Sequence, residues 1–178
     1  MLLGRRRFLV GSLGAAAAFS GVARKASAVT ASHHPLSFYH IHTGEKLSIT
    51  YRENGVLIPE ALAEINHYLR DFRTEQIHTI DVALLDKLST LFSTFDERGN
   101  FEVISGYRSP HTNAVLRQVT TGVAEHSLHI EGRAIDVRLT SAKTTDLRDA
   151  ALALQSGGVG YYAESNFVHL DTGNNRSW

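Results

Sequence analysis

The sequence predicts an α+β fold in which a small antiparallel sheet packs against several helices. Three features indicate this fold class. Short segments with alternating apolar and polar residues occur near the start, the middle and the end of the chain. Longer segments with apolar residues three or four positions apart lie between them. Two pairs of predicted strands are joined by short turns, which favours antiparallel pairing.

The predicted strands form two hairpins and two single strands. Residues 36–51 alternate on both sides of a Thr-Gly turn at 43–44, as a hairpin requires. Residues 101–105 and 133–139 are short segments rich in apolar residues and predict one strand each. Residues 158–173 predict a final hairpin. Boundaries of this kind are expected to be accurate to a few residues.

The helices are predicted from apolar spacing and from their end signals. Pro59 suits the first turn of one helix, Asp81 the N-cap of a second, and Ser109 with Pro110 the start of a third. Paired glycines end a fourth. The helical segments cover residues 58–72, 80–99, 109–119 and 144–158.

The first 28 residues differ from the rest and resemble a secretory signal peptide. Three arginines at 5–7 precede an apolar run rich in Ala and Gly, and Ala26-Ser27-Ala28 suits cleavage. The arginine pair followed by x-Phe-Leu resembles the twin-arginine signal of bacteria. Residues 1–28 are therefore predicted to be a leader removed near Ala28, and residues 29–178 to form one periplasmic domain. The alternative is an uncleaved membrane anchor.

Removing the leader makes the remaining chain acidic. It takes away five of the 18 Lys and Arg residues and none of the 18 Asp and Glu residues, which leaves 13 against 18 and a formal charge of −5. Nucleic-acid binders usually carry a basic surface, so no nucleic-acid partner is expected. No stable membrane insertion is expected after cleavage. The chain has no cysteine, so disulfides do not stabilise the exported domain.

The segment from His126 to Asp136 combines histidines, a glutamate and an aspartate around a glycine. Such a segment is either a polar surface loop or part of a metal site. Asp136 lies on a predicted strand between apolar neighbours, where an unpaired carboxylate would be costly to bury. His129, seven residues earlier, and His169, on the last predicted strand, could complete a set of nitrogen and oxygen ligands. Taken singly, each histidine is more often structural.

A resemblance favours the metal site. Residues 127–136 and 166–173 resemble the zinc site shared by D-Ala-D-Ala peptidases and the hedgehog signalling domain. The signature Ser-x-His-x-x-Gly-x-Ala-x-Asp with a later His falls on Ser127, His129, Gly132, Ala134, Asp136 and His169. Residues 101–117 and 157–162 extend the similarity to the murein endopeptidase K family, over nearly all of the chain after the leader. The resemblance implies one Zn²⁺ per chain, held by His129, Asp136 and His169, although such a site also accepts neighbouring divalent ions.

The group that takes a proton from water is left open by the sequence. Several relatives keep a Glu three residues before the second metal His, where this chain has Asn166. Two nearby carboxylates are candidates for the catalytic base: Asp171, two residues after His169, and Glu164, in the turn before it. Asp171 could instead orient His169, and Glu164 could be an exposed turn residue. Glu131 points in a direction that the sequence does not give.

Arg108 and His126 are the predicted substrate-binding residues. Arg108 lies between a predicted strand and a helix start, where a guanidinium can hold a carboxylate in bidentate fashion. The matching Arg of relatives contacts substrate, whereas the alternative is an Arg that stabilises the turn. His126 could line the cleft or be exposed. His40 and His42 share a strand face without an obvious third ligand, and are interpreted as surface residues of the hairpin.

The resemblance implies a zinc metallopeptidase that hydrolyses peptide cross-links between peptidoglycan stem peptides in the periplasm. Two alternatives stay open. The enzyme could be a D,D- or L,D-carboxypeptidase that trims stem peptides, since the ligand set does not determine which bond is cleaved. It could also be a zinc-containing murein-binding module without catalysis, as the hedgehog domain illustrates.

Overall fold

The computed structural model describes residues 33–120 and 123–178. Of the two units into which the chain divides, residues 1–30 and 31–178, the second contains all of these residues. The expected leader over residues 1–28 lies outside them and stays a prediction. No helix in the described part of the chain is both long and apolar enough to cross a bilayer.

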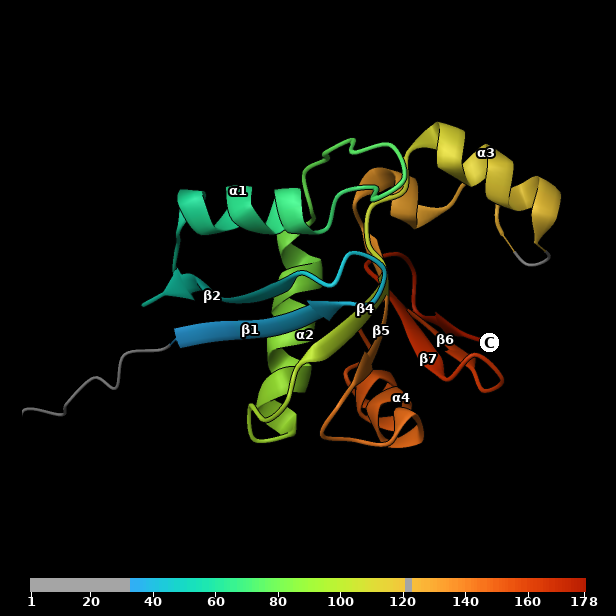
Figure 1. The fold of residues 1–178 in the computed structure, drawn as a ribbon. Coiled ribbons are helices and arrows are strands. Elements are labelled where there is room, and N and C mark those ends of the chain that lie inside the picture. Colours follow the sequence, from blue (N-terminus) through green and yellow to red (C-terminus); the bar gives the residue numbers. More distant parts are fainter. Residues whose placement is uncertain (1–32, 121–122) are drawn as a thin grey trace, which may run out of the picture. The chain divides into compact units, whose positions relative to one another are not determined.

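The described residues form a mixed sheet with helices packed against it, which confirms the α+β class (Figure 1). The sheet has eight strands in the order β3-β2-β1-β4-β5-β7-β6-β8. The strands are β1 (His33–His40), β2 (Lys46–Glu53), β3 (Val56–Leu57), β4 (Phe101–Ser105), β5 (Ala134–Leu139), β6 (Gly158–Tyr162), β7 (Phe167–Asp171) and β8 (Arg176–Ser177).

The sheet is larger than the small antiparallel sheet that was predicted, and two of its pairs are parallel. β1 pairs with β4 and β6 pairs with β8 in parallel, while the other neighbours are antiparallel. The added strands β3 and β8 have two residues each, which is too short for an alternating pattern to be visible in sequence. Parallel pairing of β1 with β4 is possible because a long connection containing two helices joins them.

All four predicted helices are present, and the first three begin where Pro59, Asp81 and Ser109 place them. They are α1 (Pro59–Tyr68), α2 (Val82–Thr94), α3 (Pro110–Val119) and α4 (Thr144–Ala153), and a 3₁₀ turn η1 covers Leu128–Glu131. The Asp81 carboxylate accepts a hydrogen bond from the backbone N–H of Ala83 at 2.9 Å, and the Ser109 hydroxyl accepts one from Thr112 at 3.2 Å. Three helices end four or five residues earlier than predicted: α1 at Tyr68, α2 at Thr94 and α4 at Ala153, before the paired glycines.

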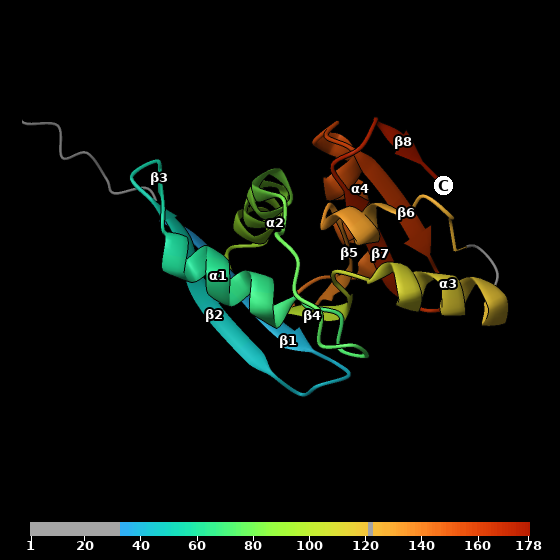
Figure 2. The ribbon, with the colours of Figure 1, turned by 90° about the horizontal axis from the view of Figure 1, so that it is seen from above.

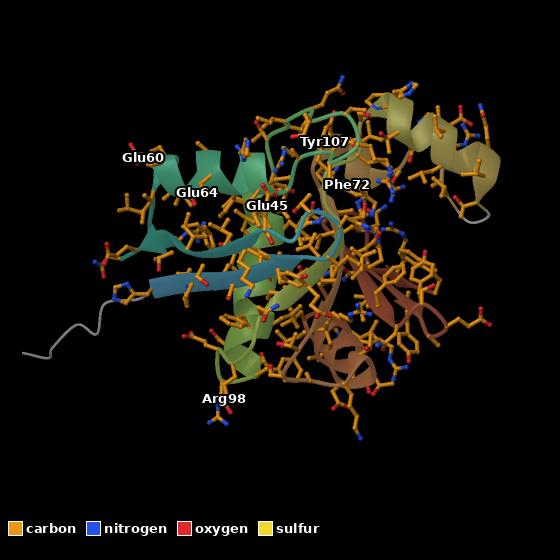
Figure 3. All side chains as sticks on the ribbon, viewed as in Figure 1. Glu45, Glu60, Glu64, Phe72, Arg98 and Tyr107 are labelled. Atoms are coloured by element: carbon orange, nitrogen blue, oxygen red, sulfur yellow. The ribbon has the colours of Figure 1, made fainter. Side chains whose placement is uncertain are left out.

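The helices α1, α2 and α4 and one face of the sheet share a single apolar core. Ile65 of α1, Leu88 of α2 and Leu147 of α4 are fully buried with strand residues such as Phe38 and Val137. Figures 1 and 2 show α1 and α2 next to β1 and β2, and α4 next to β5, β6 and β7. The helix α1 is amphipathic: Ala61, Ile65 and Tyr68 are buried, whereas Glu60 and Glu64 are exposed (Figure 3).

Alternation along the strands separates this core from the opposite face of the sheet. Ile135 and Val137 of β5 are fully buried in the core, so Asp136 between them faces the other way. On β7, Val168 and Leu170 join the core, and His169 between them lies on the same side as Asp136. The polar residues expected to form a site thus share the face of the sheet away from the core.

Candidate metal centre

Three elements bring the predicted metal ligands together. His129 lies on η1, and Asp136 of β5 stands directly opposite His169 in the antiparallel register with β7. The residues are 3%, 7% and 9% exposed in that order, so this is a buried polar cluster. Each residue can offer one ligand atom, and these atoms lie within 4.8 Å of one another. The structure therefore gathers all three residues that were predicted to bind the metal.

Gly132 makes the turn between the first two ligands possible. It follows η1 in the left-handed conformation, with φ of 67°. A Cβ at this position would lie 2.2 Å from the carbonyl oxygen of Thr79, so both the backbone angle and the close approach require glycine. The N-terminal side of η1 is capped by the hydroxyl of Ser127, which accepts from His129 N–H at 3.4 Å. Two positions of the signature thus shape the turn that carries His129.

The two imidazole nitrogens and the Asp136 carboxylate lie close enough together to bind one ion. His129 Nε2 lies 3.3 Å from His169 Nδ1 and 3.3 Å from Asp136 Oδ2, and Asp136 Oδ1 lies 2.8 Å from His169 Nδ1. Zinc bonds of roughly 2.0–2.1 Å at tetrahedral angles separate ligand atoms by about 3.3 Å. The donor set, two imidazoles and a carboxylate, is also one that zinc accepts. The residues present therefore fit the ion that the resemblance implies.

The outer nitrogen of each imidazole ring has its own acceptor. His129 Nδ1 is 2.8 Å from the carbonyl oxygen of Gly106, which can only accept, and His169 Nε2 is 3.0 Å from Asp171 Oδ2. In the neutral rings these contacts place the protons on the outer nitrogens. The inner nitrogens then direct lone pairs at one another and at Asp136, an arrangement that a cation between them would stabilise.

Charge and burial act against each other at these residues. Burial tends to raise the pKa of Asp136, but the neighbouring His129 and His169 outweigh it and hold the pKa of the carboxyl well below its usual range. Burial tends to lower the pKa of His169, and its hydrogen bonds to Asp136 and Asp171 raise it above the ordinary value instead. The cluster thus favours a negative Asp136 next to a positive partner, whether that partner is a proton or a metal ion.

The Asp171 carboxylate is fully buried and surrounded by donors. Oδ1 accepts from the backbone N–H groups of Gly158 and Gly173, both at 2.8 Å. Arg176 Nη2 donates to Oδ2 at 2.6 Å, the same oxygen that faces His169 Nε2. Although burial works in the opposite direction, these donors hold its pKa well below the usual range. Asp171 therefore lies behind His169, on the side away from the inner nitrogens.

The other acidic or amide candidates lie outside the cluster. Glu164 is exposed in the turn between β6 and β7. Asn166, at φ of 52°, accepts a hydrogen bond from the hydroxyl of Thr144 at the start of α4. Glu131, whose orientation the sequence did not give, is exposed and forms an ion pair with Arg133 at 3.0 Å. None of these three lines the cavity at the metal cluster.

A cavity of about 380 Å³ opens at the three ligands. Arg108 and His126 both line it, and Asp136 is the acidic residue of its lining within the described chain. The Arg108 guanidinium is mostly buried, donates to Asn113 and Ser105 at 3.2 and 3.3 Å, and keeps Nε without a partner among the described residues. Its burial lowers the pKa of Arg108, against the attraction of Asp136. His126 is exposed at the cavity wall.

The sequence analysis did not predict Tyr162 of β6, Arg176 of β8 or Trp178, which also line the cavity. The Trp178 ring lies 5.3 Å from that of His169, with the Arg176 guanidinium 5.0 Å from the indole centre. The residues after the final hairpin carry no periodic pattern. The single tryptophan of the chain was the available signal, since a tryptophan near a metal strand is an unusual surface residue.

Fold and site together define a peptidase of the D-Ala-D-Ala peptidase type, with a His-Asp-His cluster on the open face of a mixed sheet. A family model described as peptidoglycan L,D-endopeptidase MepK matches residues 28–178. The chain belongs to this family.

Curated relatives agree with the family model. The peptidoglycan L,D-endopeptidase MepK of Escherichia coli strain K12 is 42% identical over 143 residues, which is 80% of this chain and 79% of the relative. The probable peptidoglycan L,D-endopeptidase MepK of Haemophilus influenzae is 41% identical over 144 residues, 80% of this chain and 77% of the relative. No solved structure matches the chain significantly.

Proposed function

We propose that this protein is a zinc-dependent peptidoglycan endopeptidase that hydrolyses an L,D amide in the cross-links between stem peptides. The observation that carries the proposal is the geometry of His129, Asp136 and His169, whose inner donor atoms converge on the wall of a cavity. The family match supplies the substrate class, because the relatives are named peptidoglycan L,D-endopeptidases.

Zinc bound by the three ligands would supply a water activated near neutral pH and would polarise the scissile carbonyl. The chain provides the rest of the chemistry. Asp171 holds the proton of His169 Nε2 and so keeps Nδ1 directed inward, which makes it a positioning residue. Arg108 lines the same cavity, and its guanidinium would hold a carboxylate of the stem peptide.

Proton transfer is assigned to His126. It lines the cavity, carries no hydrogen bond to another described side chain, and is the cavity histidine that is not a metal ligand. Glu164 is the alternative, and its neighbour Ser165 does line the cavity. Either group must come within hydrogen-bond reach of the attacking water or the leaving nitrogen in the substrate complex.

The proposed location is the periplasm. A peptidoglycan substrate implies an exported enzyme, and the charge pattern of residues 1–28 supports export by a cleaved leader of the twin-arginine type.

The test uses purified protein with its zinc content measured. It is incubated with muropeptide dimers joined by an L,D amide, with dimers joined by a D,D amide, and with stem-peptide monomers. We expect the L,D dimers to become monomers, a reaction abolished by a chelator and restored by zinc. His126→Gln should lower turnover with zinc retained, whereas Glu164→Gln should leave it near the wild-type value.

Each contrary outcome points to a different function. Cleavage of D,D dimers alone would change the bond assigned to the enzyme. Release of terminal residues without loss of dimers would identify a carboxypeptidase. Bound zinc without any cleavage would favour a murein-binding module.

A further inference from the structure

Tyr162 and Trp178 form a hydrogen-bonded pair beside the metal cluster. Trp178 Nε1 and the Tyr162 hydroxyl oxygen are 3.0 Å apart. Because the indole N–H can only donate, the phenol oxygen is the acceptor in this pair. Among the described residues the phenol proton has no acceptor, so it is free for a ligand in the cavity that Tyr162 lines.

The strand register directs Tyr162 toward the metal side of the sheet. Gly160 of β6 stands opposite His169 of β7, and Tyr162 lies two residues further along the same strand. Residues two apart on a strand face the same side, so Tyr162 shares its side with His169. Arg108 lines the same cavity as Tyr162. The phenol therefore lies on the cavity side of the sheet, which it shares with the metal ligand His169.

Packing holds the pair in a fixed orientation. The Tyr162 ring stacks on Phe167 at 4.5 Å between centroids and 15° between planes. The indole occupies the space above Gly160, where a Cβ would lie 2.6–2.8 Å from the indole ring atoms. Backbone hydrogen bonds join Trp178 to Val159 at 3.3 Å and to Tyr161 at 2.9 Å. A donor held in this way needs little reorganisation during a reaction.

The Tyr162–Trp178 pair is also connected to the metal ligand His169 through Arg176 and Asp171. Arg176 lies over the indole of Trp178 and donates to Asp171, which in turn accepts from His169 Nε2. The Trp178 indole is thus hydrogen-bonded to the Tyr162 hydroxyl and lies next to the ring of the metal ligand His169.

We propose that the Tyr162 hydroxyl donates a hydrogen bond to the carbonyl oxygen of the scissile amide as that oxygen becomes negative, and that Trp178 positions it. This inference rests on the proposed function and adds an oxyanion donor to it. In the hydrolysis, water adds to the carbonyl carbon and the C–N bond breaks to give a carboxylic acid and an amine. The phenol keeps its proton throughout, and its hydrogen bond strengthens as charge develops.

The test compares Tyr162→Phe with Tyr161→Phe. Tyr161 is a matched control because it neighbours Tyr162 but packs against the apolar core under Arg148. With L,D-linked dimers as substrate, Tyr162→Phe should lower kcat by about 100-fold with KM nearly unchanged. Zinc content and the melting temperature should stay at wild-type values, and Tyr161→Phe should retain full activity.

Trp178→Phe tests the positioning role. It keeps an aromatic ring but removes the N–H, so kcat should fall by roughly 3–10-fold, less than for Tyr162→Phe. In a Tyr162→Phe background the same change should have little further effect on kcat, because both act through one hydroxyl.

Several results would overturn the inference. They are a Tyr162→Phe enzyme with kcat within about twofold of wild type, an effect on KM alone, loss of zinc, an equal loss in Tyr161→Phe, or additive effects of the two changes at 162 and 178. Wild-type protein that cleaves no substrate would overturn the proposed function and this inference with it. An active wild type with an unaffected Tyr162→Phe would overturn this inference alone.

Discussion

Two histidine pairs, one at the predicted metal site and one beside β1, have opposite electrostatic character. The rings of His129 and His169 are 5.1 Å apart, and those of His40 and His42 are 5.9 Å apart. Both pairs include a deeply buried ring, since His169 is 9% exposed and His40 is completely buried. The pKa of His169 is raised, whereas burial, His42 and two arginines lower the pKa of His40 to about 4.

The difference lies in the partners of the ring nitrogens. His169 has a carboxylate at each nitrogen, Asp136 inside and Asp171 outside. His40 accepts a weak hydrogen bond from the backbone of His42 at 3.3 Å, and its Nε2 has no partner in the described part of the chain. Its neighbours are the rings of Tyr68 and Phe72. Burial without a carboxylate at a ring nitrogen therefore favours the neutral form of His40, whereas two carboxylates make His169 suitable for a cation.

Removal of the inner carboxylate should abolish the difference between the two histidine pairs. Asp136→Asn should weaken zinc binding by more than about 100-fold and reduce cleavage to the level of chelator-treated enzyme, because a direct ligand contributes more than the residues behind it. Zinc content and a zinc competition titration measure the change. His42→Ala is the control and should keep one zinc per chain. Full zinc loading of Asp136→Asn would contradict the ligand set.

The second prediction uses the pH dependence of stability at His40. A native pKa of about 4, below the ordinary value of 6.5, means that the folded state resists protonation. Its contribution is fully present above pH 6.5 and is lost as pH falls toward 4, which amounts to about 3 kcal/mol of unfolding free energy. Denaturant unfolding between pH 7 and 4 should show this loss.

The control for that measurement is His40→Leu. It removes the titrating group together with the unpaired Nε2, so the free energy of unfolding at pH 7 should change little. The slope of that free energy against pH, between pH 6.5 and 4, should be smaller than in wild type. Glu45, Arg70, Arg73 and His42 surround the site and remain in both proteins. An unchanged slope in His40→Leu would assign the acid sensitivity to other groups.

Replacing the outer carboxylate, Asp171, tests its role behind His169. Asp171→Asn should weaken zinc binding by roughly 10–100-fold, or about 1.4–2.7 kcal/mol, because His169 loses the charged partner that orients it. Glu164→Gln is the matched control and should bind zinc like wild type, since Glu164 is exposed. If Asp171→Asn keeps its zinc affinity and loses turnover, Asp171 transfers a proton.

Much of the fold followed from local sequence signals. The caps at Asp81 and Ser109 and the hairpins around 43–44 and 164–166 are determined by neighbouring residues, and the structure has them where they were predicted. The parallel pairs and the strand β8 depend on contacts between distant segments, which alternation and capping do not encode. The order of the strands in the sheet could therefore not be predicted from alternation and capping.

The same limit separates the predicted site residues from the missed ones. The spacing of His129, Asp136 and His169 is a motif in the chain, so their meeting could be expected. His40 was interpreted as a surface residue, and this was wrong because the rings of Tyr68 and Phe72 close over it from another segment (Figure 3 labels Phe72). His42 is exposed, as predicted, and stacks on Phe72 at 4.5 Å. Tyr162 and Trp178 meet only through the pairing of β6 with β8.

The antiparallel pairing of Asp136 with His169 has a consequence for folding. Sliding β5 by one residue along β7 would exchange the two faces of the strand and remove Asp136 from the cavity. Such a molecule would turn Ile135 and Val137 out of the core and would lose the proposed metal site. In the proposed zinc enzyme, metal loading would therefore report the strand register, and zinc present during folding would select the correctly paired sheet by binding it alone.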